Sequence, residues 1–144
     1  MTVAVALAPA PARAPITVTF PGGKRVDAQV GAFTIATDQP ASGGGADSAP
    51  APFDLFLASI ATCAGIYALG FCQARGLSTE GLSLTQEVID DPATRLPAQV
   101  ILRVTAPVGF PARYRDALVR AIDGCKVKKT IARQPVFAVE LTDA

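Results

Sequence analysis

The sequence has no histidine and no tryptophan, and only one methionine and two tyrosines among its 144 residues. The lack of histidine excludes Ser-His and Cys-His dyads, acid–base catalysis by imidazole and most zinc sites. The net charge of +1, with no basic half and few aromatic rings, argues against a nucleic-acid-binding surface. Thiols are therefore the side chains best suited to carry any chemistry in this chain.

Charged residues are also scarce, at 17% against 50% hydrophobic residues. The mean hydropathy is +0.36, which is high for a soluble monomer. Two classes of protein explain this excess of hydrophobic residues. One is a membrane protein, and the other is an obligate oligomer, whose interface resembles a protein core cut in half. The length is typical of one domain with a sizeable core.

The N-terminal segment lacks the positive region and the long apolar run that a signal peptide needs. Its Ala/Pro-rich composition is typical of a linker. We therefore expect a flexible tail over residues 1–14, a single domain over residues 15–144 and a cytoplasmic location.

The first half of the domain combines short apolar strands with a glycine-rich segment. Residues 16–20, 24–30 and 32–37 predict an antiparallel meander of three strands, punctuated by glycines. Residues 38–52 are rich in Gly, Pro, Ser and Asp, and they predict a flexible connector. The triple glycine in this segment lacks the Lys-Ser/Thr pair of a phosphate-binding loop.

The remaining sequence predicts three helices and three strands, each recognised by its periodicity or by its terminal residues. The predicted elements are a helix from Pro52 to about Arg75 that ends at Gly76, strands over 82–90 and 98–107, a helix from Pro111 with Gly124 as its C′ residue, a short helix over 125–134 and a strand over 136–141. The resulting order, βββ-α-ββ-αα-β, predicts an α+β fold with antiparallel sheets and a long central helix.

The segment from Leu55 to Cys72 contains eighteen residues without a charge. That length is at the lower limit for a membrane span. An apolar helix is equally typical of a protein core, and small residues are more common here than Leu or Ile. Asp54 and Arg75 border the segment closely. These features favour a core helix, and its small residues suit close packing of two such helices across a dimer.

Three cysteines at wide spacing, with no CxxC motif, do not form a secreted disulfide framework. Cys63 and Cys72 are nine residues apart, which places them on opposite faces of a helix and about 13 Å apart along its axis. A partner for Cys63 within the chain would therefore have to be Cys125. We expect Cys72 to be an inert packing residue. The apolar surroundings of Cys63 predict a raised pKa.

Cys125 lies between two predicted helices and beside Lys126, Lys128 and Lys129. A helix N-terminus and nearby ammonium groups both stabilise a thiolate. A buried cysteine beside a solvated lysine run fits the same residues equally well.

Two segments together resemble the OsmC/Ohr family of osmotically induced and organic-hydroperoxide-resistance thiol proteins. "SAPAPFDLFLASIATCAG", Ser48 to Gly65, is similar to the family's helix opening, P-x-acidic-L followed by A-x-C. "CKVKKTI", Cys125 to Ile131, is similar to its C-P-V-x-x-T-L segment, with Lys126 in the place of the usual proline. The order and lengths of the elements also match from about residue 16 to the end.

This resemblance implies an intertwined homodimer with two long central helices side by side and with its active sites at the interface. It implies that Cys63 is the peroxidatic cysteine and that Cys125 resolves its sulfenic acid as a disulfide, which an external dithiol reductant then reduces. No metal or bound cofactor is implied. The family also has an arginine near the reactive thiol, held by an acidic residue. Asp54 matches the acidic position, and Arg25, with Lys24 behind it, is the best candidate for the arginine.

Three functions are compatible with these observations. The first is a cysteine-based peroxidase acting on organic hydroperoxides, without nucleic-acid or membrane partners. The second is a non-catalytic protein of the same fold that binds an apolar small molecule at the dimer interface. The third is a membrane protein with a single span.

Overall fold

The computed structural model describes residues 13–143, so the predicted tail lies outside the described residues except for its last two positions. The chain divides into two compact units, one that ends at Leu55 and one that begins at Phe56.

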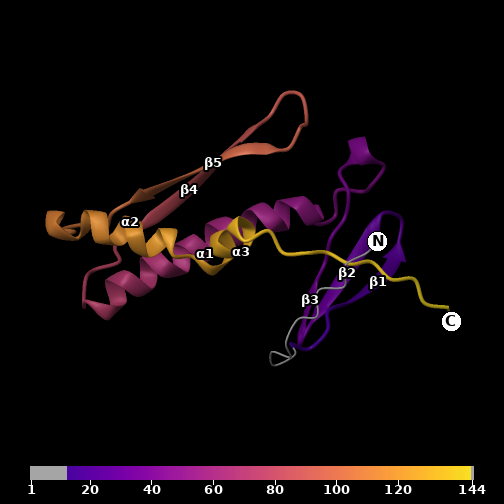
Figure 1. Ribbon diagram of the computed structural model, residues 1–144, viewed down its shortest axis with the longest axis horizontal. Coiled ribbons are helices and arrows are strands. Elements are labelled where there is room, and N and C mark those ends of the chain that lie inside the picture. The colour runs from indigo at the N-terminus through magenta and orange to yellow at the C-terminus, as the bar shows by residue number, and fades with distance from the viewer. Residues whose placement is uncertain (1–12, 144) are drawn as a thin grey trace. The chain divides into compact units, whose positions relative to one another are not determined.

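The N-terminal unit contains the predicted three-stranded meander (Figure 1). Its strands β1 (Thr17–Gly22), β2 (Arg25–Val30) and β3 (Phe33–Ile35) pair antiparallel in sequence order. The turn between β1 and β2 uses Gly22 and Gly23, both with positive φ angles that glycine adopts without steric cost. The sequence prediction for this sheet is confirmed.

The predicted flexible connector is folded around one carboxylate. Asp38 is 1% exposed and accepts hydrogen bonds from the N–H groups of Gln39 (2.8 Å), Ala46 (3.3 Å) and Ser48 (3.1 Å), and from the Ser48 hydroxyl (2.6 Å). These bonds, led by the one from the Ser48 hydroxyl, lower the pKa of Asp38 to about 2. A Cβ on Gly45 would lie only 1.9 Å from the Gln39 carbonyl oxygen, so the closed loop requires glycine there.

Helix α1 (Pro52–Ala74) matches the predicted core helix closely. Asp54 accepts a hydrogen bond from the Ala51 N–H (3.2 Å), which satisfies a free donor at the helix start. At the other end, the Leu77 N–H donates to the Cys72 carbonyl (3.0 Å) and the Gly76 N–H donates to the Gln73 carbonyl (3.1 Å). This is a Schellman motif, and it needs the positive φ of Gly76.

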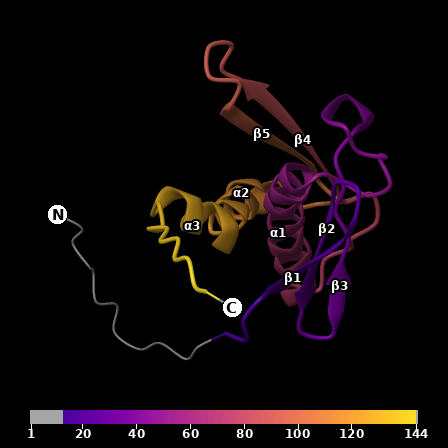
Figure 2. The same ribbon diagram turned by 90° about the vertical axis from the view of Figure 1, so that its right-hand side faces the viewer.

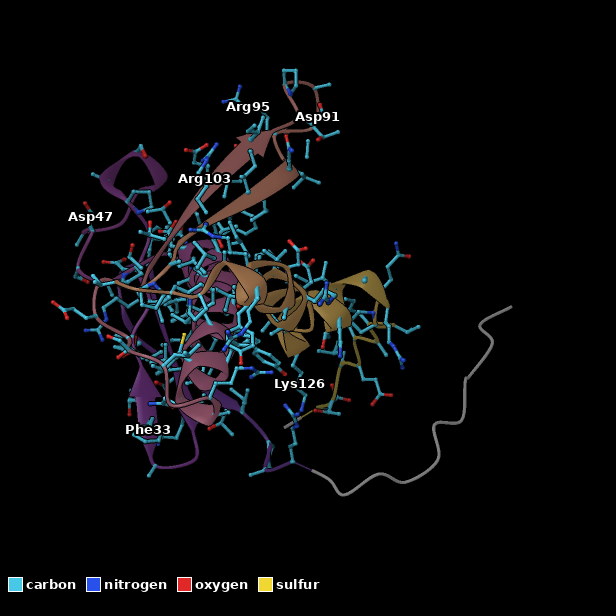
Figure 3. The ribbon with its side chains drawn as sticks, turned by 90° about the vertical axis from the view of Figure 1, so that its left-hand side faces the viewer. Phe33, Asp47, Asp91, Arg95, Arg103 and Lys126 are labelled. Atoms are coloured by element: carbon cyan, nitrogen blue, oxygen red, sulfur yellow. The ribbon has the colours of Figure 1, made fainter. Side chains whose placement is uncertain are left out.

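The C-terminal unit adds a hairpin and two short helices to α1 (Figure 1). Strands β4 (Ser83–Asp90) and β5 (Pro97–Thr105) pair antiparallel. After them come one turn of 3-10 helix (Ala112–Tyr114), α2 (Arg115–Asp123) and α3 (Lys126–Ala132). Figure 3 shows Asp91 and Arg95 at the tip of the hairpin and Arg103 further along it.

The core of this unit lies between α1 and α2, which run beside each other in Figure 2. Its buried side chains are Ala64, Ala68, Phe71, Cys72, Leu118 and Ile122. Leu84, Leu102 and Val104 of the hairpin pack against the same cluster, which fixes which strand face points inward. Cys72 is fully buried here, as expected for a packing residue.

By length and composition, α1 is the one described helix that could cross a membrane, with a mean hydropathy of 1.9 over its most apolar window. Only 28% of that window is buried within the chain. The buried part packs into the core with α2, as predicted for a core helix. The opposite part exposes large apolar residues, including Phe56 (41%) and Ile66 (58%).

The strand predicted over residues 136–141 is wrong for the single chain. Residues 134–143 form no helix or strand and are exposed throughout. Phe137 is 87%, Val139 98% and Leu141 96% exposed. A strand needs a neighbour for its backbone hydrogen bonds, and none of the described strands pairs with this segment.

Candidate active site

Cys63 lies in the middle of α1 and is partly buried. It precedes Ile66 and Tyr67 by three and four residues, so all three share one side of the helix. Cys72 lies within the buried face of α1 instead, in the core. The structure therefore separates the two cysteines, as the helical spacing predicted.

Cys125 lies between α2 and α3 and is fully buried. It is the N-cap residue of α3, where its Sγ accepts a hydrogen bond from the Lys128 N–H at 3.5 Å. Gly124, predicted to end this helix as its C′ residue, directly follows the last residue of α2, and its N–H caps the helix. The chain then turns directly into α3.

The structure brings Cys63 and Cys125 together within the C-terminal unit. It also corrects the raised pKa that the apolar helix predicted for Cys63. A hydrogen bond from the Val127 N–H lowers the pKa of Cys63 most strongly, and a hydrogen bond with the Cys125 side chain lowers it further. The Lys126 N–H and the Lys126 ammonium charge act in the same direction. Burial alone opposes them, and the pKa of Cys63 is lowered overall.

The cation that acts on Cys63 is therefore Lys126, the first residue of α3, labelled in Figure 3. The sequence had associated this lysine with Cys125 alone. Lys128 pairs instead with Asp123 at 2.9 Å. The backbone N–H of Val127 was missed entirely, because a backbone donor carries no sequence signature. The prediction of a helix beginning at Cys125 was the signal that could have identified it.

The other two predicted site residues are engaged locally. Asp54 accepts the Ala51 N–H at the start of α1. Arg25 pairs with Asp27 on β2 at 2.5 Å, while its buried Nε atom has no hydrogen-bond partner among residues 13–143. Arg25 belongs to the N-terminal unit and Cys63 to the C-terminal unit. The association of Arg25 and Asp54 with Cys63 therefore stays a prediction.

All three cysteines are free thiols. Across residues 13–143, no group of three or more Cys, Asp or Glu side chains could hold a metal ion. The arrangement can ionise one thiol and supply a second thiol beside it. That combination suits two-electron oxidation of sulfur followed by disulfide formation.

The sequence model of the OsmC-like protein family matches residues 44–140, which include both cysteines of the site. A solved structure from Psychrobacter arcticus 273-4, described as an osmotic stress induced and detoxification response protein, has 20% identity and a TM-score of 0.68, covering 80% of this chain and 85% of the other. A Legionella pneumophila structure, described as an organic hydroperoxide resistance protein and regulator of sulfide bond formation, has 22% identity and a TM-score of 0.56, covering 85% and 91%. No curated protein matches the sequence. The α+β fold class predicted from the sequence is confirmed.

Proposed function

The chain belongs to the OsmC-like protein family, and we propose that it is a cysteine-based thiol peroxidase that reduces organic hydroperoxides. One observation carries this proposal: Cys63 has a lowered pKa and lies beside the free thiol of Cys125. A thiolate is the form of cysteine that attacks a peroxide. The description of the Legionella protein as an organic hydroperoxide resistance protein supports the same class of substrate.

The first step oxidises Cys63. Its thiolate attacks the outer oxygen of the hydroperoxide, an S–O bond forms and the O–O bond breaks. The leaving alkoxide takes up a proton and departs as the alcohol, while Cys63 becomes a sulfenic acid. The Val127 N–H and the Lys126 ammonium group support this step because they stabilise the thiolate.

The second step resolves the sulfenic acid. The Cys125 sulfur attacks the Cys63 sulfur, a disulfide forms and the oxygen leaves as water. An external dithiol then reduces the disulfide by thiol–disulfide exchange and restores both thiols. The cycle requires no metal or bound cofactor. Cys72 takes no part, because it lies in the core on another side of α1 from Cys63.

We further propose that the active form is a cytoplasmic homodimer. Exposed apolar residues of α1 and of residues 136–141 support association with a second copy. In this proposal Arg25, held by Asp54, joins Cys63 in the assembled site. The substitution Arg25→Gln would then slow peroxide reduction but leave disulfide formation between Cys63 and Cys125 possible.

Thiol mapping by mass spectrometry tests the peroxidase directly. One equivalent of cumene hydroperoxide should remove two thiols per chain and create a Cys63–Cys125 disulfide. Cys63→Ser should abolish peroxide consumption, and Cys125→Ser should trap a sulfenic acid on Cys63. Cys72→Ser is the matched control and should react like the unmodified protein. If Cys63 and Cys125 both stay reduced in excess hydroperoxide, the chain is a binding protein of the same fold and the peroxidase proposal is wrong.

A further inference from the structure

One ion pair spans the joint between α2 and α3. The Lys128 ammonium group, in the first turn of α3, lies 2.9 Å from the carboxylate of Asp123, the last residue of α2. Cys125 lies between them in the chain, and its Sγ accepts a hydrogen bond from the Lys128 N–H. Lys128 therefore bonds to Cys125 through its backbone and to α2 through its side chain.

The same ion pair faces the part of α1 that carries Cys63. Asp123 and Lys128 line a cavity of about 440 Å³ together with Ile60 of α1. Ile60 is buried and precedes Cys63 by three residues, so these two residues share one side of the helix. The ion pair thus borders the space next to the helical turn that contains Cys63.

Cys125 itself is fixed to the end of α2, but α3 is attached there less firmly. The Cys125 N–H donates to the Ile122 carbonyl at 3.1 Å. Within residues 13–143, the Asp123–Lys128 bond is the one hydrogen bond or ion pair that joins a residue of α2 to a residue of α3. The direction in which α3 leaves the joint therefore depends on this ion pair as well as on the cap at Cys125.

The ion pair is only partly shielded from water. The Lys128 side chain is 27% exposed, whereas the Asp123 side chain is 71% exposed. Dissolved salt can therefore screen the attraction between them. Exposed ion pairs change an equilibrium constant by up to about fivefold, and we expect an effect of about threefold from this one.

We propose that the Asp123–Lys128 ion pair holds the first turn of α3 against the end of α2 and so keeps Cys125 in position to form a disulfide with Cys63. Both side chains are positioning groups, because they act through the placement of Cys125. The ion pair uses neither sulfur, so it persists when the two sulfurs bond. The inference rests on the proposed role of Cys125 in resolving the Cys63 sulfenic acid.

An equilibrium with glutathione tests this placement without peroxide. Glutathione disulfide oxidises Cys63 and Cys125 to a disulfide and is itself reduced to two molecules of glutathione. Lys128→Met keeps the backbone N–H and most of the side-chain length but removes the charge. It should lower the equilibrium constant for disulfide formation about threefold, and Lys128→Arg should restore the constant. Alkylation of the remaining thiols followed by mass spectrometry, in a Cys72→Ser background, measures the constant.

Three controls show whether the ion pair itself is responsible. Asp123→Asn should lower the constant as much as Lys128→Met does, and the double variant should show no further fall. Lys129→Met removes the same charge from the next residue, which forms no ion pair within residues 13–143, and it should leave the constant unchanged. Added salt should reduce the difference between Lys128→Met and the unmodified protein.

A measurement with hydroperoxide separates this inference from the peroxidase proposal. The Cys63 sulfenic acid should last about threefold longer in Lys128→Met, so dimedone should trap more of it. A shifted glutathione equilibrium in a protein that consumes no peroxide would support the ion pair and refute the peroxidase. An unchanged constant in Lys128→Met, an equal fall in Lys129→Met, a fall that Lys128→Arg does not reverse, or no Cys63–Cys125 disulfide in glutathione buffers would each overturn the inference.

Discussion

At the scale of single residues, opposite electrostatic effects meet at Cys63. Burial favours the neutral thiol, whereas the Val127 N–H, Cys125 and Lys126 favour the thiolate. The second group prevails because oriented donors act directly on a localised charge, while the thiol is only partly buried. The reactivity of this sulfur therefore depends on residues that are more than sixty positions away in the sequence.

The ionisation of Cys63 gives the first prediction. Because its pKa is lowered, the thiolate should persist to a lower pH than in an ordinary cysteine, and reactivity should fall as the pH drops through that pKa. Replacement of Cys125 by alanine should raise the pKa of Cys63 and shift the alkylation profile to higher pH. Rates of bimane alkylation against pH would measure both effects. Cys72→Ala is the control, and an equal shift in that variant would count against the assignment.

Asp38 gives a prediction about stability. Its folded pKa of about 2 is below the reference value of 3.8, so its contribution is present above pH 4 and is lost as the pH falls toward 2. Asp38→Asn should lower the thermal stability at neutral pH and flatten the pH dependence within that window. Melting followed by circular dichroism from pH 2 to pH 7 would test this. Asp47→Asn, in the same loop, is the control, and parallel pH profiles for both variants would contradict the prediction.

At the scale of elements, the ends of α1 illustrate why the sequence predicted the helix so closely. Asp54 at the start of α1 and Gly76 beyond its end bond to backbone groups within one helical turn. The local sequence is therefore enough to identify them as helix-terminating residues. Gly124, predicted to end the second helix, likewise follows its last residue and caps it. Local signals thus predicted where both helices end.

The end of α1 can be tested through Gly76. Its φ of +61° is unfavourable for any residue with a Cβ, so Gly76→Ala should cost about 1 kcal/mol of unfolding free energy. Gly65→Ala, inside the same helix with nothing within 4 Å of the added Cβ, should stabilise the protein by about 0.5–1 kcal/mol. Urea unfolding of both variants measures the difference. If both substitutions changed stability in the same direction, the Schellman assignment would be wrong.

At the scale of the whole molecule, the dominant feature is the amount of apolar surface that is exposed to solvent in the single chain. Large apolar side chains are exposed on α1 and along residues 136–141. Phe137, Val139 and Leu141 alternate as they would on one face of a strand. Such a surface is typical of chains that associate.

We therefore expect the protein to be a homodimer in which residues 136–141 take part in the interface. Val139→Asp should raise the dimer dissociation constant at least about tenfold, because it replaces buried hydrocarbon with a charge. Glu140→Gln, next to it and facing the other way, should leave the constant within about twofold. Analytical ultracentrifugation would measure both. A monomeric unmodified protein would refute this prediction.

The sequence was sufficient to predict the order of the elements up to α3, the separation of Cys63 from Cys72 and the family motifs. It could not predict the last strand correctly, because that strand needs a neighbour that the chain itself does not supply. It also could not predict the influence of the Val127 N–H on Cys63, since backbone donors depend on tertiary packing. The sequence therefore pointed to the two cysteines but not to the backbone donor that lowers the pKa of Cys63 most strongly.

The position of Cys125 as N-cap links the chemistry of its sulfur to the folding of α3. In the reduced chain that sulfur holds the first turn through the Lys128 N–H. A bond to Cys63 would draw the sulfur away and leave this amide without its acceptor. The amide proton of Lys128 would then exchange faster with solvent in the oxidised protein, so one backbone resonance would report the redox state of the whole chain.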